Sequence, residues 1–198
     1  MTFKSGPVIE GEMAPVSRRV FMVGLGAVTV YVLGHKLRAT TLPAPLPAQS
    51  VLIEQFSAGG ESEGTVTLPK VVKSASEWRA QLGPSAFRVT REAGTEMPFS
   101  GQYASTHADG IYRCVCCGTA LYDSKTKFES GTGWPSFWRP ISRVNVVNSA
   151  DSTFGMQRDA VSCRLCDAHL GHVFEDGPQP TGLRYCMNSE SLHFVPRG

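Results

Sequence analysis

The sequence of 198 residues lacks an excess of charge of either sign over most of its length. Residues 51–198 carry 14 Lys and Arg against 15 Asp and Glu, a net charge of −1. Proteins that bind nucleic acids rely on clustered Lys and Arg to hold the phosphate backbone. The sequence therefore argues against a nucleic-acid partner, and its near-neutral charge indicates no other class of partner.

Long hydrophobic runs are also missing. The apolar stretch 20–34 has 15 residues, three of them Gly, whereas a membrane-spanning helix needs about 17–25 apolar residues. It follows the pair Arg18-Arg19 and precedes a basic cluster at 35–38. This order resembles a twin-arginine signal, which directs export of a folded protein. We expect residues 1–48 to be this signal and the protein to be periplasmic, or attached to the membrane and facing outward. A plain membrane anchor is the alternative, because residues 41–48 contain no clear cleavage site.

Charged residues are few, at 18%, while 41% of residues are hydrophobic and Gly and Pro together number 33. This composition is too apolar for a disordered chain and too rich in turn formers for a helical bundle. It predicts one mainly β domain over 74–198. Segment 49–73, which follows Pro43, Pro45 and Pro47, is expected to be an extended, flexible linker. The domain should begin with short helices over 76–82 and 85–93, the first capped near Ser76, and continue with strands that include 111–113, 144–147 and 192–195.

The six cysteines contain two C-x-x-C pairs, Cys114 with Cys117 and Cys163 with Cys166. Two such turns can present four thiolates to one tetrahedral ion, which predicts one structural Zn²⁺ per chain. A protein that folds before export can take up this zinc in the reducing cytoplasm. A disulfide framework and a mixed site that uses His169 or His172 are the alternatives.

Two cysteines remain, Cys116 and Cys186. Cys186 lies between Arg184 and Asn188, a setting that suits a reactive thiol. A free thiol is mostly protonated at pH 7, so a nucleophile needs a cation, an imidazolium or hydrogen-bond donors beside it. Arg184, Asn188, His169 and His172 are the candidates for this role. On spacing alone, a buried structural cysteine is the favoured interpretation.

From about Ser76 to Pro196 the chain resembles the methionine sulfoxide reductase B family. The resemblance rests on the two C-x-x-C pairs and on the stretches EAGTEMPFSG (92–101), SGTGWPSF (130–137), CRLCDAHLGHVF (163–174), DGP (176–178) and RYCMNS (184–189). It implies a fold of two antiparallel sheets with short N-terminal helices and a zinc ion on the four paired cysteines. It also implies reduction of the R epimer of methionine sulfoxide, free or in peptides, with Cys186 as the nucleophile that becomes a sulfenic acid.

The resemblance gives the remaining candidate residues their roles. His172 is expected to protonate the sulfoxide oxygen, with His169 supporting it, because an imidazole suits proton transfer at neutral pH. Asn188 is expected to orient the reacting groups, and Trp134 to offer an aromatic face to the substrate methyl group. Arg184 is either catalytic or a solvated charge, and His107 and His193 are expected to be structural.

The chain departs from a common family pattern at Thr132, where many relatives carry the cysteine that resolves the sulfenic acid. Cys116 is the only spare thiol. We expect an external thiol, such as a thioredoxin-like reductant, to regenerate the enzyme, and we expect a monomer. The competing interpretations are a zinc-stabilised module that binds peptides without catalysis and a thiol–disulfide oxidoreductase that uses a C-x-x-C pair.

Overall fold

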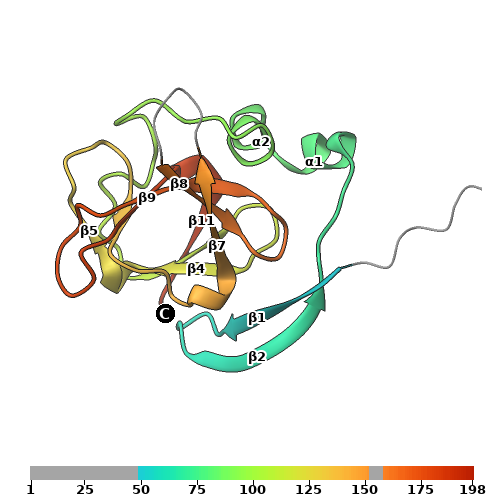
Figure 1. Ribbon diagram of the computed structural model, residues 1–198, viewed down its shortest axis with the longest axis horizontal. Coiled ribbons are helices and arrows are strands. Elements are labelled where there is room, and N and C mark those ends of the chain that lie inside the picture. Colours follow the sequence, from blue (N-terminus) through green and yellow to red (C-terminus); the bar gives the residue numbers. More distant parts are fainter. Residues whose placement is uncertain (1–48, 152–157) are drawn as a thin grey trace, which may run out of the picture. The chain divides into compact units, whose positions relative to one another are not determined.

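The computed structural model describes residues 49–151 and 158–198 of the chain. The predicted export signal, residues 1–48, lies outside this part. Among the described residues, no helix is both long and apolar enough to cross a membrane. The described part is mainly β with antiparallel sheets and two short helices, which confirms the expected fold class (Figure 1).

The largest sheet has six strands, and each strand runs antiparallel to its neighbours. Its central strand β10 alternates half-buried and buried residues, because successive side chains of a strand point to opposite faces. Tyr185 and Met187 face the core, and Arg184 and Cys186 face the other way. In spatial order the strands are β5 (Lys127–Phe128), β6 (Ser136–Phe137), β10 (Arg184–Met187), β9 (His169–Phe174), β8 (Arg158–Cys163) and β7 (Val146–Asp151).

A second sheet of three strands contributes aromatic side chains to the core. Tyr112 and Tyr122 are cross-strand partners and are fully buried. Phe137 of the six-stranded sheet stacks on Tyr122 at 4.4 Å between ring centroids and meets Tyr112 edge-on at 5.0 Å. Such aromatic packing joins the two sheets. The strands of this sheet, in spatial order, are β11 (Leu192–Pro196), β3 (Gly110–Cys114) and β4 (Ala120–Asp123).

The N-terminal segment differs from the prediction. Strands β1 (Ser50–Phe56) and β2 (Ser62–Pro69) form an antiparallel hairpin where a flexible linker over 49–73 was expected, so that prediction is wrong for this stretch. The hairpin is integrated into the domain: Ile53 is 3% exposed, and Asn145 bonds both backbone groups of Glu54. Both strands contain β-branched residues, Val51 and Ile53 in β1 and 65–67 in β2, and the flanking Pro and Gly obscured this pattern.

The two helices lie where the sequence predicts them. Helix α1 (Ala75–Gln81) is capped by Ser74, two residues before the expected Ser76, in a reciprocal capping box with Glu77. Helix α2 (Pro84–Arg91) starts with a proline, which suits the first helical position because its missing N–H would have no partner there. Short 3₁₀ turns η1 (Ser124–Thr126), η2 (Arg143–Asn145) and η4 (Ser189–Ser191) complete the described elements.

Candidate active site and metal centre

A row of polar side chains crosses the six-stranded sheet on the face opposite the core. Cys186 of β10 lies in register with Ser136 of β6 on one side and with His172 of β9 on the other. Directly opposed residues of antiparallel strands project to the same face, with Cβ atoms about 4.5–5.5 Å apart. The pairing therefore brings a hydroxyl, a thiol and an imidazole together from positions as far as 50 residues apart in the sequence.

The thiol opens into a small cavity of about 110 Å³. A half-buried indole, an imidazole and a phenyl ring form much of its wall, so the cavity combines apolar faces with one thiol and one imidazole. Its lining residues are Thr95, Trp134, Gly171, His172, Phe174, Cys186, Met187 and Asn188. The sequence-predicted residues Cys186, His172, Trp134 and Asn188 thus meet at one cavity.

Burial raises the pKa of the Cys186 thiol above its ordinary value. The neighbouring groups act in the opposite direction: the hydroxyls of Thr132 and Ser136 and the guanidinium of Arg184 all favour the thiolate. The Thr132 Oγ1 atom lies 3.9 Å from the Cys186 sulfur. At neutral pH the Cys186 thiol is therefore mainly protonated. Groups that would stabilise its thiolate already lie around the sulfur atom.

Arg184 is held in place rather than solvated, since its side chain is only 11% exposed. Its guanidinium forms two hydrogen bonds of 2.8 Å with the carboxylate of Asp176 and lies 4.4 Å from the centre of the Phe174 ring. Hydrogen bonding by Arg184 lowers the pKa of Asp176. Because residues two apart in a strand share a face, this fixed cation stands beside Cys186. The alternative of a solvated charge is therefore wrong.

The two histidines of β9 differ in their position. His172 lines the cavity, whereas His169 is 8% exposed and is absent from the cavity lining. Their ring centroids are 5.3 Å apart in an edge-to-face arrangement. His169 therefore packs against His172 and lies outside the cavity, and its predicted supporting role stays a prediction.

The carboxamide of Asn188 is engaged by the protein backbone. Its Oδ1 accepts a hydrogen bond from the Glu96 N–H at 3.0 Å, and its Nδ2 donates to the carbonyl of Leu170 at 3.0 Å. Asn188 thus ties the segment around Thr95 to β9 and holds the cavity wall together. Its predicted role in orienting the reacting groups stays a prediction.

Glu96 is a supporting residue to which the sequence analysis assigned no role. Its buried carboxylate accepts hydrogen bonds from the N–H groups of Ser189 and Glu190, at 2.8 and 3.0 Å, directly after the strand that carries Cys186. Its carbonyl oxygen accepts the indole N–H of Trp134 at 3.2 Å. The glutamate lies in the EAGTEMPFSG stretch, but the partners of its carboxylate are more than 90 residues away, so no local pattern could reveal these contacts.

Gly171 allows β9 and β10 to approach each other behind the cavity. A Cβ atom at this position would lie 2.1 Å from the carbonyl oxygen of Cys186, a distance that no side chain can accept. Only glycine permits this backbone contact, which sets the position of Cys186 relative to His172.

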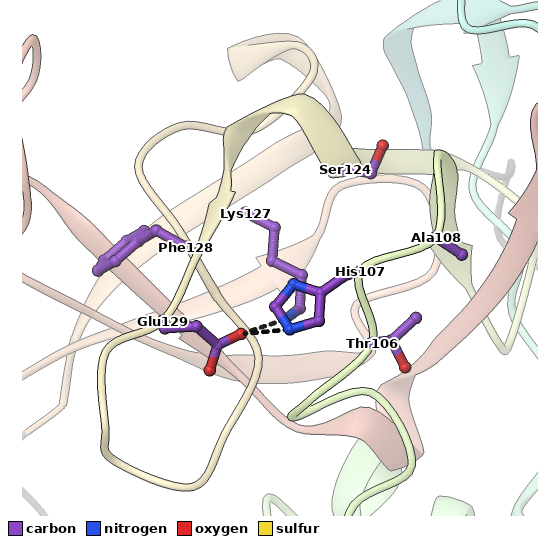
Figure 2. Close-up of a pocket in the computed structure, with 7 residues that line it drawn as sticks. All are labelled: Thr106, His107, Ala108, Ser124, Lys127, Phe128 and Glu129. Carbon is purple, nitrogen blue, oxygen red and sulfur yellow. Dashed lines mark hydrogen bonds and ion pairs between the residues drawn. The ribbon is translucent and has the colours of Figure 1, made fainter.

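His107, which the sequence analysis left as a structural residue, lines a second cavity of about 220 Å³ (Figure 2). Its Nε2 atom lies 3.7 Å from the carboxylate of Glu129, which also lies 3.4 Å from the ammonium of Lys127. This cavity and the Cys186 cavity share no lining residue.

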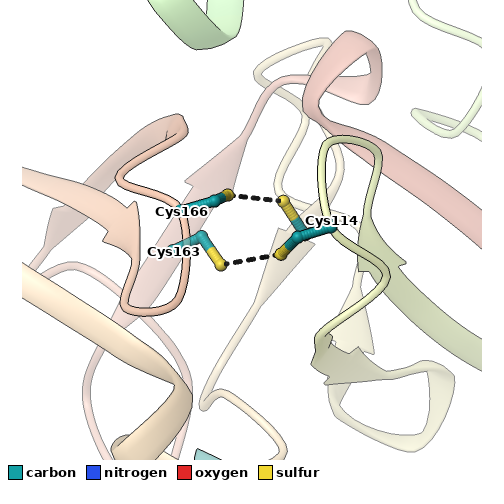
Figure 3. Close-up of side chains that lie close together, drawn as sticks. Cys114, Cys163 and Cys166 are labelled. Carbon is teal, nitrogen blue, oxygen red and sulfur yellow. Dashed lines mark hydrogen bonds between the residues drawn. The ribbon is translucent and has the colours of Figure 1, made fainter. Parts of the chain in front are cut away.

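The four paired cysteines converge just before the start of β9, away from His172. Their sulfur atoms all lie within 4.8 Å of one another, and the pairs Cys114–Cys166 and Cys117–Cys163 are each 3.6 Å apart (Figure 3). Four thiolates at Zn–S distances of about 2.3 Å form a tetrahedron with edges of about 3.8 Å. The cluster therefore has the size and chemistry of a zinc site.

The cluster also excludes the alternatives left open for these residues. All six cysteines are free thiols, so the structure contains no disulfide framework among them. The set is purely cysteine, while His172 faces the other cavity. Hydrogen bonds among the neighbouring thiols lower the pKa of Cys117 and raise that of Cys114, so these thiols titrate as one coupled group.

Each C-x-x-C pair sits at the turn of a different sheet. The first follows β3 and precedes β4, and the second connects β8 with β9. Cys116 is buried in the first turn, where its carbonyl accepts a hydrogen bond from Gln81 of α1. It is absent from the lining of the Cys186 cavity, so the structure does not bring the spare thiol to Cys186.

Comparisons with known proteins agree with this geometry. Residues 82–196 match the SelR domain family. The chain is 55% identical over 130 residues to "Peptide methionine sulfoxide reductase MsrB" of Pseudomonas fluorescens strain Pf0-1, covering 66% of the chain and 99% of that protein. It is 56% identical over 128 residues to the protein of the same name from Chromohalobacter salexigens, covering 64% of the chain and 96% of that protein. The hairpin β1–β2 lies before the matched SelR region. The chain therefore belongs to the SelR family of MsrB-type methionine sulfoxide reductases.

Proposed function

We propose that this protein is an oxidoreductase that reduces methionine-R-sulfoxide, free or within peptides, to methionine, with Cys186 as the nucleophile. The observation that carries the proposal is the cross-strand row of Ser136, Cys186 and His172 beside a cavity walled by Trp134 and Phe174. The names of the relatives, peptide methionine sulfoxide reductase, support the same substrate class.

The first step is attack of the Cys186 thiolate on the sulfoxide sulfur. The sulfoxide is reduced to the thioether, the S–O bond breaks, and the oxygen is transferred to Cys186, which becomes a sulfenic acid. The proton that leaves the thiol ends on the oxygen of the sulfenic acid, so one methionine sulfoxide and one thiol yield one methionine and one sulfenic acid. The fixed guanidinium of Arg184 and the hydroxyl of Thr132 stabilise the attacking thiolate.

Proton delivery to the sulfoxide oxygen falls to His172. Its ring lies on the same face as the Cys186 sulfur, and His169 packs against it from behind. General acid catalysis of this kind contributes typically about 10²–10⁴-fold to a rate. Loss of His172 should therefore slow turnover strongly without abolishing nucleophilic attack.

Trp134 and Phe174 give the cavity an apolar wall for the S-methyl group of the substrate. The Trp134 indole is oriented by its hydrogen bond to the Glu96 carbonyl. This orientation is set before substrate binds, so little ordering is required when the methyl group packs against the ring.

Regeneration requires two thiols from outside the cavity. One thiol condenses with the sulfenic acid and releases water, and a second reduces the resulting mixed disulfide, so two electrons pass to the sulfoxide overall. The position 3.9 Å from the Cys186 sulfur is a threonine, which has no thiol to offer. The spare thiol, Cys116, lies in the turn of the four-cysteine cluster and away from the cavity. An external thiol, such as a thioredoxin-like reductant, therefore supplies the electrons. We also propose that the enzyme is a monomer.

One Zn²⁺ on Cys114, Cys117, Cys163 and Cys166 would supply a structural crosslink between the two sheets.

We also propose that residues 1–48 export the folded protein by the twin-arginine route, which places the repair of oxidised methionine outside the cytoplasm. The pair Arg18-Arg19 before an apolar stretch supports this location.

The test is reduction of N-acetyl-methionine sulfoxide, supplied as separate R and S epimers, with dithiothreitol as the electron source. The proposal expects consumption of the R epimer alone by the zinc-loaded protein and loss of consumption in Cys186→Ser. Cys116→Ser is the matched control, a cysteine outside the cavity whose replacement should leave R-epimer reduction in place. If neither epimer is consumed by folded protein, the chain is a binding module and the proposal fails.

A further inference from the structure

The hairpin β1–β2 packs beside the four-cysteine cluster, in contacts that the proposed reaction does not use. It lies before the region that matches the SelR family and is nonetheless part of the folded domain. Ile53 of β1 belongs to the same hydrophobic core as Leu165 and the three buried cysteines of the cluster. The lining of the Cys186 cavity contains no residue of the hairpin. Its position therefore links the hairpin to the metal centre rather than to the site of the reaction.

The segment directly after β2 is bonded to the second cysteine turn, residues 163–166. The Val71 N–H donates to the carbonyl of Leu165, inside this turn, at 2.9 Å. The Lys70 ammonium lies 2.5 and 2.7 Å from the two carboxylate oxygens of Asp167, the residue that follows the turn. Asp167 has a positive φ of 55°, which is uncommon for a residue with a side chain. The ion pair with Lys70 thus holds the chain at the point where it leaves the turn in this uncommon conformation.

The first cysteine turn, residues 114–117, is bonded to the other end of the same hairpin through Arg113. The Arg113 guanidinium donates to the carbonyls of Phe56 and Ser57, where β1 ends, at 2.9 and 2.8 Å. It also donates to the carbonyl of Gly118 at 3.3 Å. Because Arg113 precedes the turn and Gly118 follows it, one side chain joins both ends of the turn to the hairpin. The hairpin is therefore attached to both cysteine turns, which belong to different sheets.

A cavity of about 210 Å³ lies between the hairpin and the first cysteine turn. Its wall combines hairpin residues, among them Ile53 and Leu68, with Cys117 and Leu165 of the two turns. Cys117 is half-buried, whereas the other three cysteines of the cluster are buried. The cluster therefore opens toward solvent at Cys117, and the hairpin lies across this opening.

We propose that the hairpin β1–β2 retains the metal: it fastens the two cysteine turns and covers Cys117, so that a bound Zn²⁺ leaves slowly. Release of a four-coordinate ion requires its ligands to move apart, and each turn supplies two of them. Because the hairpin is bonded to both turns, they cannot separate while its contacts with Asp167 and Arg113 hold. The inference rests on the zinc site proposed above and not on the reaction at Cys186. In the oxidising compartment proposed for this protein, retention also protects the cysteines from disulfide formation.

The experiment follows the loss of zinc from the zinc-loaded full chain in excess EDTA, by metal analysis of the desalted protein at timed intervals, with a phosphine present to keep the thiols reduced. Lys70→Met removes the ion pair and keeps the aliphatic part of the side chain, and it should speed zinc loss about two- to fivefold. Arg113→Met removes three hydrogen bonds from a charged donor and should speed it about tenfold. Lys73→Met is the matched control, because the ammonium of Lys73 contacts Gln81 and Trp78 and neither cysteine turn.

Zinc content and melting temperature separate the possible outcomes. If the unaltered protein, produced with added zinc, binds none, the zinc site fails and the retention role fails with it. If it binds one ion per chain, but Lys70→Met and Arg113→Met lose zinc no faster than Lys73→Met, the zinc site stands and the retention role is overturned. The zinc-loaded Lys70→Met variant should melt within about 3 °C of the unaltered protein, because only a partly exposed ion pair is lost. A larger fall would attribute its faster zinc loss to global unfolding and would overturn the retention role as well.

Discussion

Ile53→Ala tests whether the hairpin β1–β2 is part of the folded domain. The side chain is 3% exposed and belongs to the hydrophobic core, although its strand lies before the region that matches the family. Truncating a buried isoleucine to alanine typically costs about 2–4 kcal/mol of unfolding free energy, from lost burial and the cavity left behind. For a domain of this size that loss lowers the melting temperature by about 5–15 °C.

Leu52→Ala is the control, because Leu52 is the neighbouring residue of the same strand, points to the opposite face and is 47% exposed. Its truncation should change the unfolding free energy by less than about 0.5 kcal/mol. The assay is thermal unfolding of both zinc-loaded variants followed by circular dichroism. Equal melting temperatures for Ile53→Ala, Leu52→Ala and the unaltered protein would refute the reasoning and return segment 49–73 to a flexible linker.

Two further predictions concern Cys186, the proposed nucleophile. Arg184→Met should raise the pKa of the Cys186 thiol further, because the fixed cation that favours the thiolate is removed while burial still opposes it. The thiolate is the reactive form, so alkylation of Cys186 by iodoacetamide should slow at pH 7 and its rise with pH should move to higher pH; an unchanged or lower pKa would contradict the assignment. Thr132→Cys should let the sulfenic acid close an internal disulfide, since residue 132 already lies 3.9 Å from the Cys186 sulfur. Without added reductant, one turnover should then leave Cys186 unlabelled by dimedone, whereas the unaltered protein should be labelled; labelling of both would show that position 132 cannot resolve the sulfenic acid.

Residue types alone indicated the four-cysteine cluster, whereas the resemblance to the family indicated the roles of the cavity residues Cys186, His172, Trp134 and Asn188. Two C-x-x-C pairs, a leftover cysteine and two nearby histidines are visible in the one-dimensional pattern, and the structure places the four paired sulfurs within 4.8 Å. The helices were also predictable, because Ser, Gly and Pro mark their ends locally. Each C-x-x-C pair and each helix end depends on residues only a few positions apart, which is the range over which a single sequence is informative.

The supporting contacts could not be predicted for the same reason. The carboxylate of Glu96 bonds Ser189 and Glu190 across more than 90 residues, and Asn145 joins Glu54 across 91. Such pairings depend on strand register, which the whole fold determines. The hairpin was missed in a different way, since proline and glycine on either side of short alternating strands resemble a linker in composition.

One strand, β9, joins the four-cysteine cluster to the row of Ser136, Cys186 and His172. The turn with Cys163 and Cys166 leads directly into β9, which begins three residues later and carries His172 opposite Cys186. The other cysteine pair lies at the turn between β3 and β4, so a bound ion would fix the start of β9 to a second sheet. A shift of β9 by one residue would turn His172 to the opposite face, and Gly171 would no longer lie against the Cys186 carbonyl. We therefore expect a zinc ion at the four cysteines to support the proposed catalysis through the register of β9, although the four cysteines do not line the Cys186 cavity.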